Sequence, residues 1–484
     1  MSIAATFANA LSGLAASGRA AQVVSSNIAN AMTPGYARRE LELTSVSLGG
    51  TGTGVAVVGV NRVVNRAVLT ELRLADAARG GADCRAEALK RIEDLFGLPG
   101  EAGSLADSLT AFESALAVAA SRPDSAARLD AAAGAAAALA QKLNAIGDGI
   151  QAIRAEADAA IAAAVGQLNA DLAAIGRLNA DILAYRTLGR DVTALCDQRQ
   201  ALVDRVATQV ALREIPRPDD QIALVSEGGA ILLDPTPAVI GFTRTPTITA
   251  DMTIGSGALS GLTIDGAPAT AGARDLLGGG TLAAWLDLRD RIATTAQADA
   301  DAFARDLIGR FTGPAVDPTL APGDPGLFTD AGAAFLPADE AGLAGRIALN
   351  ALADPAQGGA SWRLRDGLMA ASPGAPGEAR QILAWAAALD SPGTVQSGRA
   401  AGQSLDAAAL AAETLSAVSA ARTAAEGEAA RAAGRAEGLR SLHLRDGVDS
   451  DAELQALILV EQAWAANARV LETMDGLLRR LMEI

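Results

Sequence analysis

The end of the chain, residues 449–484, carries apolar side chains at intervals of three and four over nearly four heptads. This spacing places them along one side of a helix, as in helices that pack against a partner helix. At 1.5 Å per residue the helix would be about 50 Å long. Because a helix with one apolar side is not stable alone in water, it needs a partner. Ser450 and Glu453 fit a capping box at its start.

The first residues, 1–36, carry a second stripe of this kind. Ile3, Phe7 and Leu14 belong to it, and Arg19 is the only charged residue before Arg38. Small uncharged residues fill the rest of the surface, which suits close packing on several sides. Periodicity alone fits two interpretations equally, a helix docked on its own globular core and a helix that packs among other subunits. Pro34-Gly35 fits the central pair of a type II turn, which would end the helix.

Composition excludes some classes of function. The 484 residues suffice for several domains with a sizeable core. Half of them are hydrophobic while aromatic residues make up only 3%, which favours slim, alanine-rich helices. The net charge of −16 argues against a nucleic-acid partner. The sequence predicts neither a signal peptide nor a membrane span, because we see no basic and apolar leader pattern and no apolar run of about 18 residues.

Both ends of the chain resemble one protein family. The run SSNIANA at residues 25–31, followed by TPGY at residues 33–36, resembles the N-terminal signature of the bacterial flagellar rod, hook and hook-associated proteins. The run EQAWAANARVL at residues 461–471 resembles their C-terminal signature, with Trp464 where tyrosine is common. Two internal runs, around Asp197-Gln198-Arg199 and at residues 279–290, resemble the hook-associated members in particular.

The resemblance implies a structural component of the flagellum at the junction between hook and filament. It implies export by the flagellar type III apparatus, a secreted extracellular location, and a ring of copies. The implied partners are the hook protein, a second junction protein and an export chaperone on the C-terminal helix. The terminal helices would form the assembly interface, with these residues: Ile3, Phe7, Leu11, Leu14, Val24, Asn27, Ile28, Asn30, Pro34, Gly35, Tyr36, Leu454, Leu457, Ile458, Trp464, Asn467, Leu471, Leu478 and Leu481.

The middle of the chain reads as a helical body with a β-rich insertion. Helical periodicity covers residues 104–121, 281–311 and 404–440, and it covers 124–212 with a break near residues 187–190. Proline, glycine and short β-branched runs at residues 215–280 predict small strands. We expect the helix at residues 404–440 to pair with the long helix at 124–212, and the insertion to lie at the tip, far from the chain ends.

These patterns predict a mainly α, multidomain fold with a smaller β part. The expected domains are a coiled-coil-like terminal domain (residues 1–44 and 446–484), a helical body with some strands (45–213 and 281–445), and the inserted β domain (214–280).

Nothing in the sequence predicts catalysis. A single histidine, His443, and two isolated cysteines leave no metal cluster, cofactor site or catalytic triad, and we do not expect Cys84 and Cys196 to form a disulfide. Two alternatives stay open. One is another axial protein of the family, a hook or distal-rod protein. The other is a secreted enzyme carried on the flagellum, with its active part in the β insertion.

Overall fold

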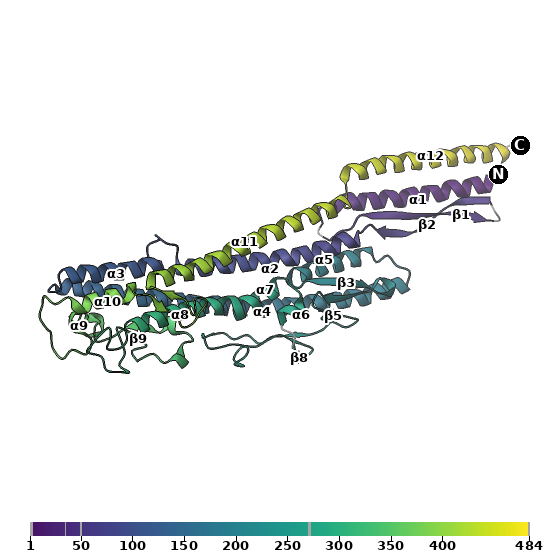
Figure 1. Cartoon of the computed structure of the whole chain (residues 1–484). Coiled ribbons are helices and arrows are strands. Elements are labelled where there is room, and N and C mark those ends of the chain that lie inside the picture. The colour runs from purple at the N-terminus through teal and green to yellow at the C-terminus, as the bar shows by residue number, and fades with distance from the viewer. Residues whose placement is uncertain (1–2, 34, 49–50, 270–272, 483–484) are drawn as a thin grey trace.

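The computed structural model describes residues 3–33, 35–48, 51–269 and 273–482. The molecule is elongated, and the two chain ends lie together at one end of it (Figure 1). Long helices dominate, and the strands of the described residues form small sheets of two or three strands. The predicted mainly α fold with a smaller β part is therefore confirmed.

The end of the molecule that carries both termini is a unit of two helices and a hairpin. Helix α1 lies between helix α12 and the antiparallel hairpin β1–β2, all extended in the same direction (Figure 1). We call these four elements the terminal unit. The hairpin runs across residue 44, where the sequence suggested a domain boundary; the domain division itself stays a prediction. The bounds are α1 (Ile3–Ala29), β1 (Arg39–Leu48), β2 (Thr51–Arg62) and α12 (Ser450–Met482).

The start of α12 differs from the predicted capping box. Asp449 Oδ1 accepts hydrogen bonds from the backbone N–H groups of Asp451 (2.9 Å) and Ala452 (3.2 Å), so Asp449 is the capping residue. The Glu453 carboxylate does not reach back to the cap. It accepts a hydrogen bond from Arg38 Nε at 2.8 Å instead, because the chain before β1 passes directly beside it.

The body begins with four helices. Ser104 caps the second of them by accepting a hydrogen bond from the Asp107 N–H at 3.1 Å. The predicted break near residues 187–190 is confirmed, and Gly189 there takes a φ of 66°. The four helices are α2 (Arg66–Phe96), α3 (Leu105–Ser121), α4 (Ala126–Thr187) and α5 (Thr193–Gln209).

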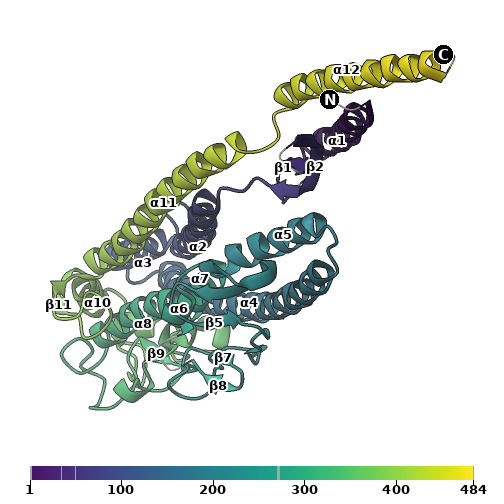
Figure 2. The ribbon, with the colours of Figure 1, turned by 90° about the vertical axis from the view of Figure 1, so that its right-hand side faces the viewer.

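The returning helix α11 (Ala407–Arg445) packs along α2, and the predicted pairing with the long helix at 124–212 is wrong (Figure 2). Small alanine side chains bring the two helices close, and ion pairs follow their contact line. The pairs join Arg85 to Glu428 (2.5 Å), Arg422 to Glu93 (2.7 Å), Arg435 to Glu71 (2.8 Å) and Arg440 to Asp76 (2.8 Å). His443 lies in the last turns of α11 rather than in the connection that follows.

The β insertion lies beside the body and not at its tip. Asn169 and Asn179 of α4 hold its strands through bonds to the backbone oxygens of Ile240 (2.7 Å) and Ile222 (2.8 Å). Figure 1 shows α3 and α10 at the end farthest from the chain ends, so the predicted place of the insertion is wrong. The insertion contains β3 (Leu212–Pro216), η1 (Pro218–Asp220), β4 (Ile222–Ser226), β5 (Ile231–Leu233), β6 (Ile240–Gly241), β7 (Thr263–Ile264), β8 (Ala267–Pro268) and α6 (Ala273–Leu277).

The predicted helix at residues 281–311 returns along α4 in three continuous segments, the middle one a short π-helical stretch. Short strands and turns then connect it to α11. The elements are α7 (Thr281–Asp287), η2 (Leu288–Ile292), α8 (Ala293–Arg310), β9 (Phe328–Asp330), η3 (Pro337–Asp339), η4 (Leu343–Gly345), β10 (Ile347–Leu349), η5 (Pro355–Gln357), α9 (Arg363–Asp366), α10 (Arg380–Asp390), β11 (Gly393–Thr394) and β12 (Ser404–Leu405).

Two large apolar cores stabilise the body, and α4 contributes to both. Its first part packs with α3, α8 and α10, and its second part packs with α5, α7 and the insertion. By length and composition alone α4 could also cross a membrane, with a mean hydropathy of 1.3 over its most apolar 18 residues. Its large apolar residues, such as Leu143, Ile150 and Leu168, are fully buried in the cores, so we interpret α4 as a core helix.

Four aromatic side chains form the centre of the core that lies farthest from the chain ends. Phe311 contacts Phe112, Phe328 and Trp385, with ring centroids 6.0, 5.3 and 5.5 Å away. Phe311→Ala should lower the free energy of unfolding by about 3–5 kcal/mol, because it leaves a cavity among buried rings. Leu383→Ala on α10, where the side chain is 56% exposed, should change it little. Equal losses in chemical denaturation would contradict this assignment of the core.

Both cysteines are free thiols, as expected. Burial raises the pKa of Cys84 to about 11. Burial also raises the pKa of Cys196. Because the thiolate is the reactive form, alkylation of Cys84 in the folded protein should keep accelerating up to about pH 11. In urea the alkylation rate should level off just above pH ~8.5, because that is the ordinary pKa of a cysteine thiol. Mass spectrometry after timed alkylation measures both profiles, and a plateau near the ordinary value in the folded protein would contradict the raised pKa.

Candidate functional site: the surface of the terminal unit

Most side chains of helix α12 are exposed although the helix packs along α1. Among its described side chains only Glu453 and Met474 are buried. A helix of 33 residues in a soluble core normally buries a full stripe. Here large apolar side chains on several sides of the helix are at least 38% exposed: Leu454, Ile458, Leu459, Trp464, Val470, Leu477 and Leu478.

Helix α1 is buried more on the side that faces α12 and the hairpin. Asn467 of α12 lies against Gly13, where an added Cβ would come within 2.7 Å of the Asn467 amide. The two helix backbones therefore approach closely through a glycine. Toward its start, Phe7 and Leu11 remain 42% and 54% exposed. These two side chains add to the apolar surface.

The hairpin adds a third exposed apolar surface that the sequence analysis missed. Leu43, Val46, Val57 and Val58 are 40–58% exposed on it. Residues 43–60 contain no charged residue, although edge strands usually carry charges that prevent pairing with other chains. That absence of charge is the sequence signal that could have identified this surface.

The turn after α1 agrees with its predicted type. The Tyr36 N–H donates to the Thr33 carbonyl oxygen at 3.1 Å, and Gly35 has a φ of 78°. Both values fit a type II turn, which needs a positive φ at its third residue. Pro34, which would be the second residue, lies outside the described residues.

Asn27 forms contacts within the chain rather than on the surface. Its Nδ2 donates to the Arg39 carbonyl oxygen (2.9 Å), and its Oδ1 accepts from the Arg39 N–H (2.9 Å) and from the Tyr36 hydroxyl (2.8 Å). The side chain is 1% exposed, so these bonds replace all contact with water. The signature residues thereby tie the start of β1 to the end of α1.

The predicted interface residues thus divide into three groups. Phe7, Leu11, Leu454, Ile458, Trp464 and Leu478 are exposed and free to contact another molecule. Leu14, Ile28, Asn30, Gly35, Tyr36, Leu457, Asn467 and Leu471 are partly buried, while Val24 and Asn27 are buried. Pro34 and the side chains of Ile3 and Leu481 lie outside the described residues. The assignment of these residues to an assembly interface stays a prediction.

One ion pair joins the hairpin side of the terminal unit to α12. Arg38 Nε donates to Glu453, whose side chain is 3% exposed, while Arg38 is 35% exposed. The hydrogen bond to Glu453 raises the pKa of the Arg38 guanidinium. The contact fixes the first turn of α12 beside the chain that enters β1.

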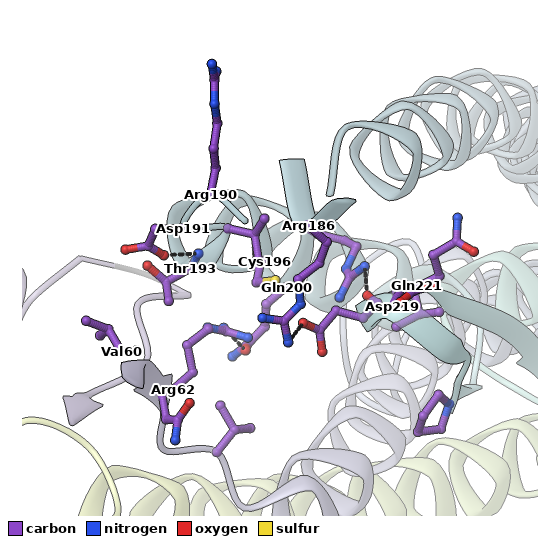
Figure 3. A pocket seen from close by; sticks show the side chains of 18 of the residues that line it. Val60, Arg62, Arg186, Arg190, Asp191, Thr193, Cys196, Gln200, Asp219 and Gln221 are labelled. Carbon is purple, nitrogen blue, oxygen red and sulfur yellow. Dashed lines mark hydrogen bonds and ion pairs between the residues drawn. The ribbon is translucent and has the colours of Figure 1, made fainter. Parts of the chain in front are cut away.

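A cleft of about 1260 Å³ separates the terminal unit from the body (Figure 3). Seven arginines and five carboxylates of the described residues line it. Arg199 lies at its wall with Nη1 donating to Asn179 Oδ1 (2.8 Å) and to the Asp220 carbonyl oxygen (2.6 Å), and burial lowers its pKa. His443 does not line the cleft, and among the described residues no group of three His, Cys, Asp or Glu side chains could hold a metal ion.

Two family models match parts of this chain. The family model of the flagellar hook-associated protein FlgK helical domain matches residues 89–312, and the model of the flagella basal body rod protein matches residues 7–36. No curated protein sequence matches. Among solved structures, the flagellar hook junction protein FlgK from Burkholderia pseudomallei is 18% identical with a TM-score of 0.42, and the alignment covers 54% of this chain and 46% of that chain.

A rod-protein match on α1 and a hook-associated match on the body together define a structural component of the bacterial flagellum. Most of the helical body, residues 89–312, matches the family model of the flagellar hook-associated protein FlgK helical domain, which supports identifying the chain as a hook-associated protein. The family predicted from the two ends is therefore confirmed, and both internal runs noted in the sequence lie within the matched body.

Asn27→Ala should loosen the start of β1, because it removes both hydrogen bonds to the Arg39 backbone. Hydrogen exchange at the Arg39 amide should become about tenfold faster or more, the effect of losing a buried bond of ~1–2 kcal/mol. Asn30→Ala is the matched control, since the Asn30 side chain bonds to the Ser26 carbonyl oxygen and the Thr33 hydroxyl, both at the same helix end. Unchanged exchange in the Asn27 variant would contradict this role.

Proposed function

We propose that this chain forms the junction between the flagellar hook and the filament, as a ring of copies that pack through their terminal units. The observation that carries the proposal is the set of large apolar side chains of α12 that stay exposed although the helix packs along α1. A helix with this pattern is stable only when another surface covers it. In a ring each copy would cover part of the surface of its neighbour.

The arrangement of the apolar surfaces supports repeated assembly over a closed pair. Helix α12 and the hairpin lie on opposite sides of α1 (Figure 1), and each carries exposed apolar side chains. One chain therefore cannot cover both surfaces by itself. When two different surfaces of identical chains bind each other, the same contact can repeat from copy to copy. The copies close into a ring when the rotation between neighbouring copies divides the full circle evenly.

The other partners and the route to the site follow from the family. The hook protein would contact the ring on one side and a second junction protein on the other. An export chaperone would cover the apolar stripe of α12 before secretion through the flagellar type III apparatus. The protein would then act outside the cell, as part of the flagellum, without membrane insertion.

A purely structural role, without enzymatic activity, is part of the proposal. The match of the FlgK helical domain over residues 89–312 favours a junction protein over a hook or distal-rod protein. The β insertion, where an enzyme would need its active part, packs its apolar residues into the core with α4 and α5. This packing supports a structural insertion.

Replacing Ile458 and Leu459 together by Asp should abolish attachment of filaments. These side chains are 53% and 66% exposed, so the fold should tolerate the change while the apolar surface is lost. Cells that carry the variant should shed filament protein into the medium, which immunoblotting of the culture supernatant measures.

The matched control replaces two equally exposed apolar residues of the body, Leu188 (68%) and Leu336 (59%), by Asp. This variant should keep its filaments. Filaments that remain attached in the α12 variant would refute the proposal, and so would filaments shed to the same extent by both variants.

A further inference from the structure

The terminal unit joins the body through two chain connections that lie side by side. One links β2 to α2 and the other links α11 to α12. Asn65 Nδ2 in the first donates to Asp446 Oδ2 in the second at 3.2 Å. Two adjacent connections form a hinge, about which a unit can rotate unless a further contact holds it.

A single carboxylate of the body supplies a further contact. Asp197 on α5 accepts hydrogen bonds from Arg62 Nε at 2.7 Å, from Arg39 Nη2 at 3.0 Å and from the Ala37 N–H at 3.3 Å. Its side chain is 12% exposed, and those of Arg39 and Arg62 are 17% and 18% exposed. All three donors belong to the terminal unit or to the chain that leads into it.

The turn after α1 rests on the same part of α5. A Cβ added at Gly35 would lie 3.0 Å from the Ala201 Cβ and 3.2 Å from the Asp197 carbonyl oxygen. The glycine thus allows the turn to approach α5 closely. Two stretches that are far apart in the sequence, residues 35–37 and 197–201, therefore meet at one point.

The surroundings of this point are polar and open. Arg62 Nη2 also donates to Gln200 Oε1 at 2.7 Å, and the cleft of about 1260 Å³ occupies the space beside it. Polar interfaces between parts of a chain permit relative motion by default. Removing a carboxylate that neutralises two mostly buried guanidinium groups leaves their charges uncompensated, which is strongly unfavourable.

We propose that Asp197 is a positioning residue that fixes the angle between the terminal unit and the body. With Asp197 in place the terminal unit keeps one angle to the body, and without Asp197 it takes up many angles. The inference rests on the proposed function in one respect: a fixed angle aligns the terminal units of neighbouring copies in the ring. The contact of Asp197 with the terminal unit lies within a single chain, so its effect on the angle can be measured on the isolated protein.

The test compares Asp197→Asn with Asp219→Asn in the full chain. Asp219 is an exposed carboxylate that lines the same cleft as Gln200 and as Arg62, the partner of Asp197, so each variant removes one negative charge in this region. Spin labels at Gln455→Cys on α12 and Ala184→Cys on α4, both exposed positions, report the angle through their distance distribution. Cys84→Ala and Cys196→Ala are present in all samples.

We expect Asp197→Asn to widen the distribution about twofold, while Asp219→Asn leaves it as in the parent protein. Asp197→Glu, which keeps the charge, should restore a narrow distribution, and thermal unfolding of the body should be the same in all variants. Distance distributions of equal width for Asp197→Asn and Asp219→Asn would overturn the inference. A distribution in the parent protein as broad as that of Asp197→Asn would also overturn it. This experiment does not measure filament attachment. A negative result would therefore not contradict the proposed junction role, and a negative result in the filament-attachment experiment would not contradict the role of Asp197.

Discussion

The packing of both apolar cores on one continuous helix is the constraint on which the rest of the body depends. Residues of α4 from Leu129 to Ile153 belong to one core, and those from Ile161 to Ile175 belong to the other. Because the helix is continuous between the cores, it fixes their relative orientation. Alanine-rich faces let α2 and α11 lie close beside each other, which explains how an elongated body forms with few aromatic residues.

The terminal unit differs from the body in how it places its large apolar side chains. The body buries its large apolar side chains, whereas α12 leaves most of them exposed, and the hairpin leaves an uncharged surface open. Three polar residues instead hold the unit together. Asn27 holds the start of β1, Glu453 holds Arg38, and Asp197 receives both arginines of the hairpin. Apolar side chains thus face outward while polar ones fix the shape of the unit.

The sequence was sufficient for the family, the fold class and most helix boundaries, because long stripes and proline or glycine breaks are local signals. It failed where the outcome depends on packing between distant segments. Nothing in the alanine-rich run at residues 404–440 distinguishes α2 from α4 as its partner, and only the ion pairs with α2, such as Arg422 to Glu93, distinguish them in space. Likewise, Asn27 is polar and lies in a signature, yet its partner on β1 became visible only in the fold.

The distribution of the four tryptophans has a practical consequence. Trp285, Trp362 and Trp385 lie in the body, and Trp385 is fully buried, whereas Trp464 stands 51% exposed on α12. Its indole therefore samples water in the free chain and a drier environment whenever another molecule covers the stripe. The chain thus carries its own fluorescent reporter at the surface where contact matters, and the burial of that surface can be followed in solution without an added label.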